Sequence, residues 1–206
     1  MSAIVKRAYP DTPHHKTVSE AVEILKRDGV IVYPTDTIYG LGADLLSKKA
    51  MERILRIKQA EKGKPLSFIL NNLKDIAHYA IVPDYAYKIM RRVTPGPYTF
   101  ILKATKNTPK YLLFKQKTIG IRIPRAPLAL AIIEELGRPI LSSSVPGSEE
   151  GFHSDPFEIE QEYGSLVDLI LDGGVMYNNP STMVDFSGDM PEIIREGAGP
   201  VDALMF

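Results

Sequence analysis

The chain has 206 residues, of which 44% are hydrophobic and 24% charged, a composition typical of a folded globular protein. It contains no cysteine, which excludes a disulfide scaffold, a thiolate nucleophile and a cysteine zinc site. Lys and Arg together number 25, as do Asp and Glu, so an anion-binding site would have to come from local clustering of charge. The sequence shows neither a signal peptide nor a run of about 18 apolar residues, and we expect a cytoplasmic protein without a membrane span.

The first predicted element is a helix over residues 17–28. Thr17 and Glu20 form a capping-box pattern at its start, and Gly29 ends the apolar periodicity. The β-branched run at 30–33 then predicts a buried strand, which ends at a proline.

Polar residues gather directly after this strand, in the sequence PTDTIYGLG. Thr35, Asp36 and Thr37 place two hydroxyls and a carboxylate at a strand end, where open α/β sheets usually bind ligands. The same residue types form turns through local side-chain hydrogen bonds. A ligand site and an ordinary turn therefore both remain open for this segment.

A second helix is predicted from the cap at Ser47 through Lys58, followed by a buried strand at 66–70. The stretch RILRIKQAEKGKPLS carries the cations Arg53, Arg56, Lys58, Lys62 and Lys64. Basic residues also favour the last turn of a helix. This stretch is therefore either a cationic ligand patch or a solvated helix end.

The rest of the chain continues to alternate helices and strands. In its middle part we predict helices at 72–79 and 84–93, a strand pair at 98–104 and 118–123, and a helix at 127–136. In its last part we predict strands at 139–142, 167–171, 182–186 and 192–195, with a loop at 142–156 and a helix opening at Asp155, Pro156 and Glu158. Because most connections are short and no linker stands out, we predict one α/β domain over residues 1–206.

Several familiar motifs do not fit. Pro65 follows Lys64 where a P-loop needs Ser or Thr, and Leu45 replaces the third glycine of the dinucleotide pattern that Gly40 would start. Ser148 lacks the GxSxG setting of a hydrolase nucleophile. The histidines lack metal-binding spacing, so we predict no metal site on the protein itself.

Two arginines stand within or at the end of apolar strands, Arg122 in IGIRIPRAP and Arg195 in IIREG. A cation in a strand built for burial needs an anionic partner. That partner is either a structural carboxylate or a bound phosphate or carboxylate.

Seven segments, taken in order, resemble the YrdC/YciO-like family over residues 18–199. They are GVIVYPTDTIYGLG, KQAEKGKPLSFIL, TPGPYTFIL, TIGIRIPRAP, LSSSVPG, PSTMVDF and IIREG. The TPGPYTFILK, PGSE and SDP details are most similar to the YciO branch. The resemblance implies an α/β fold, a twisted open mixed sheet with flanking helices around a large concave basic cavity. For the catalytic branch it implies threonylcarbamoyl-adenylate synthesis from ATP, threonine and bicarbonate, a step in tRNA modification.

The resemblance also assigns site residues. It places the nucleotide at Lys58, Lys64, Ser142, Ser144, Ser181, Thr182 and Arg195, and the amino acid at Thr35, Thr37, Tyr39 and Arg122. Lys58 and Arg122 are the candidate catalytic residues, and ATP with magnesium is the implied substrate, with no tightly bound cofactor.

The sequence departs from the family pattern at two positions. Ala60 replaces the arginine of the KxR motif, and Pro146 replaces the asparagine of the SxN motif. Two nucleotide contacts are therefore missing, and Lys62 or Lys64 could compensate for Ala60. We carry three hypotheses: a YciO-type protein that binds nucleotide or RNA phosphate and retains synthase-like activity, a non-catalytic binder of double-stranded RNA, tRNA or rRNA, and a regulatory binder of threonine or nucleotide without turnover.

Overall fold

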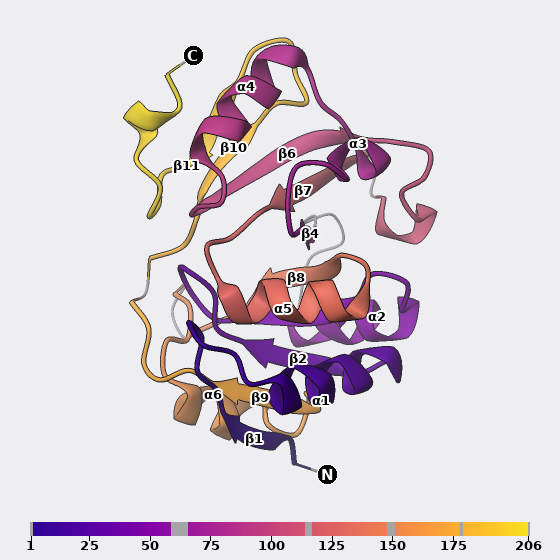
Figure 1. Ribbon diagram of the computed structural model, residues 1–206, viewed down its shortest axis with the longest axis vertical. Coiled ribbons are helices and arrows are strands. Elements are labelled where there is room, and N and C mark those ends of the chain that lie inside the picture. The colour runs from indigo at the N-terminus through magenta and orange to yellow at the C-terminus, as the bar shows by residue number, and fades with distance from the viewer. Residues whose placement is uncertain (1, 59–65, 114–116, 148–150, 178, 206) are drawn as a thin grey trace.

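The computed structural model describes residues 2–58, 66–113, 117–147, 151–177 and 179–205. Their strands form one mixed sheet in the order β1-β9-β2-β3-β8-β4-β7-β6-β10-β11, with β5 paired to β6 outside this path. Figure 1 shows β1, β9 and β2 at one end of this sheet and β6, β10 and β11 at the other. The strands are β1 (Ile4–Arg7), β2 (Val30–Tyr33), β3 (Gly40–Asp44), β4 (Ser67–Ile69), β5 (Ala80–Ile81), β6 (Tyr98–Ala104), β7 (Thr118–Arg122), β8 (Ile140–Ser144), β9 (Leu169–Asp172), β10 (Thr182–Asp185) and β11 (Glu192–Arg195).

Six α-helices of the described residues flank the sheet: α1 (His15–Lys26), α2 (Lys48–Ile57), α3 (Ile76–Tyr79), α4 (Asp84–Val93), α5 (Pro127–Leu136) and α6 (Pro156–Tyr163). Two short 3₁₀ turns, η1 (Lys110–Leu112) and η2 (Val201–Ala203), complete the elements. The helices α1 and α5 lie side by side over the part of the sheet that holds β2, whereas α4 lies at the other end, near β6 and β10 (Figure 1). The predicted α/β class and flanking helices are therefore confirmed.

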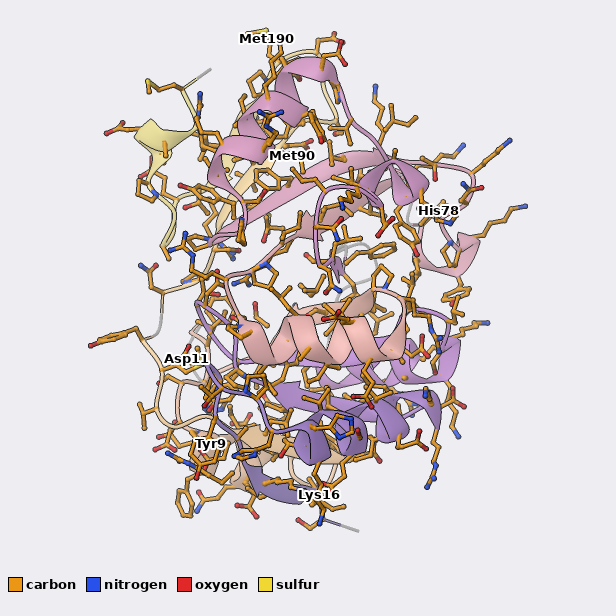
Figure 2. All side chains as sticks on the ribbon, in the orientation of Figure 1. Tyr9, Asp11, Lys16, His78, Met90 and Met190 are labelled. Carbon is orange, nitrogen blue, oxygen red and sulfur yellow. The ribbon has the colours of Figure 1, made fainter. Side chains whose placement is uncertain are left out.

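The core lies on both faces of the sheet, because successive strand residues point to opposite sides. In β2, Val30 and Val32 belong to one apolar cluster, whereas Ile31 and Tyr33 belong to a second cluster that also contains α1 and α5. Met90 on α4, labelled in Figure 2, is fully buried in the first cluster.

Figure 2 also labels residues at the two ends of the molecule's long axis. Met190 lies at one end, in the connection between β10 and β11, and Lys16 lies near the other, in the first turn of α1. Nowhere in the described parts of the chain is a helix both long and apolar enough to cross a membrane.

Most predicted elements are confirmed, and α4 and α5 begin and end at the predicted residues. The predicted capping box is wrong, because α1 begins at His15 and Thr17 is buried inside its first turn. The predicted helix at 72–79 shrinks to α3, because the Asn72 Oδ1 accepts a hydrogen bond from the backbone N of Lys74 (2.8 Å) and forms a local turn first.

The strand β3 was not predicted, although it shapes the site. Its sequence, GLGAD, lacks the residues typical of strands. Its glycines are needed for packing: a Cβ on Gly42 would lie 2.9 Å from the Tyr33 ring, and one on Gly40 would lie 3.1 Å from it. The segment read as a turn therefore includes a buried strand, which pairs with β2 and β8.

Candidate functional site

A cavity of about 500 Å³ lies where β8 joins the two parts of the sheet, pairing with β3 on one side and β4 on the other. Its apolar lining comes from Ile38, Ile69, Ile101, Phe152, Met183 and Ile194. Its hydroxyl groups belong to Thr35, Tyr39, Ser67, Thr99, Ser142, Ser143, Ser144 and Ser181. The described lining contains three cations, Lys58, Arg122 and Arg195, and no carboxylate. Such a volume falls in the usual range of small-molecule sites.

Arg122, the last residue of β7, is 8% exposed and is held by the predicted turn after β2. Its Nη2 forms an ion pair with Asp36 and donates to the Thr37 Oγ1 (2.7 Å) and the Thr35 Oγ1 (3.3 Å). Asp36 in turn accepts a hydrogen bond from the backbone N of Arg125 (2.9 Å). Asp36 is therefore the structural carboxylate partner of Arg122, which is one of the two partners that the sequence allowed. Its buried Nε finds no hydrogen-bond partner in the described structure.

The turn itself is stabilised locally. The Thr35 hydroxyl donates to the carbonyl of Ile38 (2.7 Å), and its oxygen accepts a hydrogen bond from the backbone N of Thr37 (3.1 Å). The ordinary-turn interpretation is thus correct, and Thr35 still lines the cavity. Thr37 is 4% exposed and meets the site through Arg122 instead.

Arg195, at the end of β11, has no carboxylate partner among the residues that the structure describes. Its Nη2 and Nε donate to the carbonyl of Ser181 (2.9 and 3.2 Å), and no ion pair to it occurs within the described chain. Burial, and then the neighbouring charge of Arg122, lower the pKa of the guanidinium. Its positive charge is therefore not balanced by any described carboxylate, which favours an external anion.

Lys58 reaches the cavity from the C-cap of α2, and its Nζ donates to the Ser143 Oγ (2.6 Å). The start of the same helix is fixed by Ser47, whose Oγ accepts from the backbone N of Ala50 (3.0 Å) and donates to Asp28 (2.6 Å). The predicted cap is confirmed, and it sets where α2 delivers Lys58. Ala60, Lys62 and Lys64 lie outside the described residues.

Several hydroxyls of the lining are already engaged. The Tyr39 hydroxyl donates to the carbonyl of Gly174 (2.7 Å) and accepts from the backbone N of Gly173 (2.9 Å), so it holds the turn after β9. Burial raises the pKa of Tyr39 to about 12, so its phenol stays neutral at physiological pH. Ser142 pairs with the Tyr33 hydroxyl (2.7 Å), while Ser181 pairs with Thr99 (2.8 Å).

Thr182 does not line the cavity. It is fully buried, donates to the carbonyl of Gly199 (2.6 Å) and accepts from the backbone N of Gly197 (2.9 Å). These contacts fix the segment that follows β11, so Thr182 stabilises the surroundings of the cavity without lining it. Ser144, in contrast, does line the cavity.

Sequence reasoning missed several lining residues, among them Phe152, Ser143 and Ile194. Phe152 forms an isolated antiparallel bridge with Pro146, which brings the predicted loop back to the cavity. The only feature of the sequence that pointed to Ser143 was the LSSS run, because successive serines of one strand lie on both of its faces. The described residues contain no group of three His, Asp or Glu side chains able to hold a metal ion.

Comparisons with known proteins identify relatives of this chain. The profile of the Sua5, YciO and YrdC proteins, described as telomere recombination, matches residues 23–197. The chain is 45% identical over 196 residues to the uncharacterized protein YciO of Escherichia coli K12, which covers 94% of this chain and 95% of that protein. It is 36% identical over 193 residues to a putative threonylcarbamoyl-AMP synthase of Methanocaldococcus jannaschii, covering 90% of this chain and 89% of that protein.

Solved structures show the same fold. The crystal structure of E. coli YciO gives a TM-score of 0.93 at 43% identity, covering 98% of this chain and 100% of that one. Sua5 of Pyrococcus abyssi, crystallised with L-threonine, gives a TM-score of 0.90 at 25% identity, and the match covers 97% of this chain and 59% of Sua5.

Proposed function

The chain belongs to the Sua5, YciO and YrdC family, and from this premise we propose that its cavity binds Mg-ATP and threonine and joins them with bicarbonate, as a threonylcarbamoyl-AMP synthase does. One observation carries the proposal. Lys58, Arg122 and Arg195 come from three distant elements and meet in a cavity whose described lining has no carboxylate. The structure of P. abyssi Sua5 with L-threonine supports the amino-acid part.

The proposed reaction has two bond-forming steps. The threonine amine attacks bicarbonate, a C–N bond forms and water leaves, which gives a carbamate. A carbamate oxygen then attacks the α-phosphorus of ATP, and the bond to the departing pyrophosphate breaks. Both steps bring anions together, so the work of the protein is to orient them and to neutralise charge.

The three cations suit these tasks differently. Lys58, whose Nζ donates to the Ser143 Oγ, and Arg195, which has no ion pair within the described chain, both line the cavity and are placed for the phosphates. Arg122 is neutralised by Asp36 but also lines the cavity, and its guanidinium is the proposed partner of the threonine carboxylate. Magnesium enters with ATP, whose phosphates would supply most of its ligands.

The departures from the family pattern reduce the contacts available to the nucleotide. Pro146 has no side-chain amide and no backbone N–H, so it cannot replace the donors of asparagine. Ser144 and Ser143 remain at the cavity beside Lys58. We therefore expect a slower enzyme than relatives with the complete motifs.

Pyrophosphate release tests the proposal. The protein, Lys58→Ala and Arg195→Met would be assayed with Mg-ATP and bicarbonate, with and without threonine, and Arg91→Met on the exposed side of α4 serves as the matched control. We expect threonine-dependent release that both cavity variants lose and the control retains.

Other results would refute catalysis in distinct ways. Binding of Mg-ATP or threonine without release would make the protein a regulatory binder. No binding of either, together with duplex RNA binding that weakens steeply with salt, would favour the RNA-binding alternative, because phosphate neutralisation releases counterions.

A further inference from the structure

His153 lies between two carboxylates close to the cavity. Its Nε2 is 2.6 Å from the Glu162 Oε2, and its Nδ1 is 3.3 Å from the Glu158 Oε2. The imidazole is 10% exposed, whereas the glutamate side chains are 51% and 60% exposed. Both nitrogens of one ring are thus directed at acidic groups, although nothing in the proposed reaction uses this residue.

The charged form of the ring satisfies both of these contacts, whereas a neutral ring satisfies only one. A neutral imidazole has one N–H donor and one lone pair, so one of its nitrogens would face a carboxylate with no proton between them. The imidazolium donates from both nitrogens and meets both carboxylates. The glutamates also lie four residues apart on α6, where like charges repel each other, and the positive ring offsets that repulsion.

The segment around His153 forms part of the cavity wall. The preceding residue, Phe152, lines the cavity and bridges to Pro146, and the Gly147 N donates to the carbonyl of Gly151 (3.0 Å). Neighbouring residues of an extended segment point to opposite sides. Phe152 therefore faces the ligand space while His153 faces α6.

The other end of the segment holds two further elements. The carbonyl of Ser154 accepts a hydrogen bond from the backbone N of Met176 (2.9 Å), which lies in the crossing from β9 to β10. Asp155 caps α6 by accepting a hydrogen bond from the backbone N of Phe157 (2.9 Å). His153 therefore lies next to Phe152 in a short segment that is tied to its neighbours at both ends.

We propose that His153 is a positioning residue, whose imidazolium clamps the 151–154 segment to α6 and thereby sets Phe152 in the cavity wall, so that Mg-ATP binds more tightly at mildly acidic pH. This inference rests on the proposed function, because Mg-ATP is the ligand whose binding is regulated. As the pH rises and the ring loses its proton, one of the two contacts turns repulsive and the clamp loosens. Histidine is the side chain whose charge changes between about pH 5 and pH 8.

The titratable groups in direct contact with His153 in the described structure all belong to α6. They are Glu158, Glu162 and Tyr163, whose ring packs edge-on against the imidazole with centroids 5.8 Å apart. Hydrogen bonds from Tyr163 and then from His153 lower the pKa of Glu162, which favours its carboxylate form.

Binding of Mg-ATP by calorimetry at about pH 6 and about pH 8 tests the proposal. We expect affinity roughly threefold to tenfold higher at the lower pH, the range that one or two partly exposed ion pairs supply. His153→Gln keeps a hydrogen-bonding side chain but removes the charge, so its affinity for Mg-ATP should not increase at the lower pH. The double variant Glu158→Gln and Glu162→Gln should lose the increase in affinity as well. Because ATP itself titrates, His78→Gln is the matched control: His78 belongs to α3 (Figure 2), does not line the cavity, and its replacement should leave the pH profile unchanged.

Two results would overturn the clamp. The first is a His153→Gln variant whose affinity for Mg-ATP changes with pH as that of the unsubstituted protein does. The second is a His78→Gln variant that loses the pH dependence of Mg-ATP affinity to the same extent as His153→Gln. If Mg-ATP binds at neither pH, the proposed function fails, and amide exchange still tests the clamp. Exchange of the Gly147 and Met176 amides, corrected for intrinsic rates, should then be slower at about pH 6 in the unsubstituted protein only. Equal protection in His153→Gln would refute the clamp independently of any ligand.

Discussion

Replacing Arg195 by methionine distinguishes a cation that serves a ligand from one that serves the fold. In the absence of ligand, the substitution has two opposing effects. The buried carbonyl of Ser181 loses its donors, at 2.9 and 3.2 Å, which costs about 1–3 kcal/mol. At the same time the substitution removes a half-buried charge that lies near Arg122 and has no described carboxylate partner. Removing this unfavourable charge should increase the free energy of unfolding by a similar amount.

The net change in unfolding free energy should therefore be within about 1 kcal/mol. For a protein of this length, that corresponds to a shift in Tm of no more than about 4 °C. The effect on binding should be much larger. A charge-assisted hydrogen bond is worth about 1.5–3 kcal/mol, so the Kd for Mg-ATP should rise roughly 10- to 140-fold.

Calorimetric titration with Mg-ATP and ligand-free thermal unfolding measure these two quantities. Arg91→Met removes the same charge from the exposed side of α4 and should leave both unchanged. A change in Kd of less than about threefold would show that Arg195 does not contact the nucleotide. A fall in Tm of more than about 8 °C would show that the arginine is structural, and either result would refute the reasoning.

Other substitutions test the surroundings of the site. Arg122→Met should destabilise the fold by about 3–5 kcal/mol in chemical denaturation, because it strands the Asp36 carboxylate at 11% exposure, and adding Asp36→Asn should restore most of the loss. Burial raises the pKa of Tyr33 to about 12; stability from its neutral phenol should be complete below about pH 10 and disappear as the pH rises through about 12, and Tyr33→Phe should make that alkaline transition shallower. Ser47→Ala removes the hydroxyl that accepts from the Ala50 N and should cost about 1 kcal/mol in thermal unfolding, whereas serine replaced by asparagine should retain most of the stability.

Elements with a strong local signal could be predicted from the sequence. The helix α5 has a proline at its first position and Gly137 in the left-handed conformation just after its end, and both features are read directly from the residue types. The cations of the site were equally visible, since Arg122 and Arg195 stand out in apolar strands. Where local rules determine conformation, the sequence alone was sufficient.

Long-range contacts could not be predicted in the same way. Nothing local indicates that the Tyr39 hydroxyl bonds the turn at Gly173 and Gly174, more than 130 residues away. The glycine-rich β3 has few strand-forming residues, and both its pairing with β2 and β8 and its close packing against the Tyr33 ring are contacts of the folded chain. Likewise, Phe152 reaches the cavity through a bridge that the loop composition conceals.

The position of β9 has a consequence for how the chain acquires its structure during synthesis. This strand lies between β1 and β2 and pairs in parallel with both, so the two earliest strands meet their shared neighbour only after residues 169–172 have been made. Until then, the apolar edge of β2 has no partner on that side. Parallel pairing over such a separation is intrinsically slow, so this part of the sheet is expected to form only once most of the chain has been made.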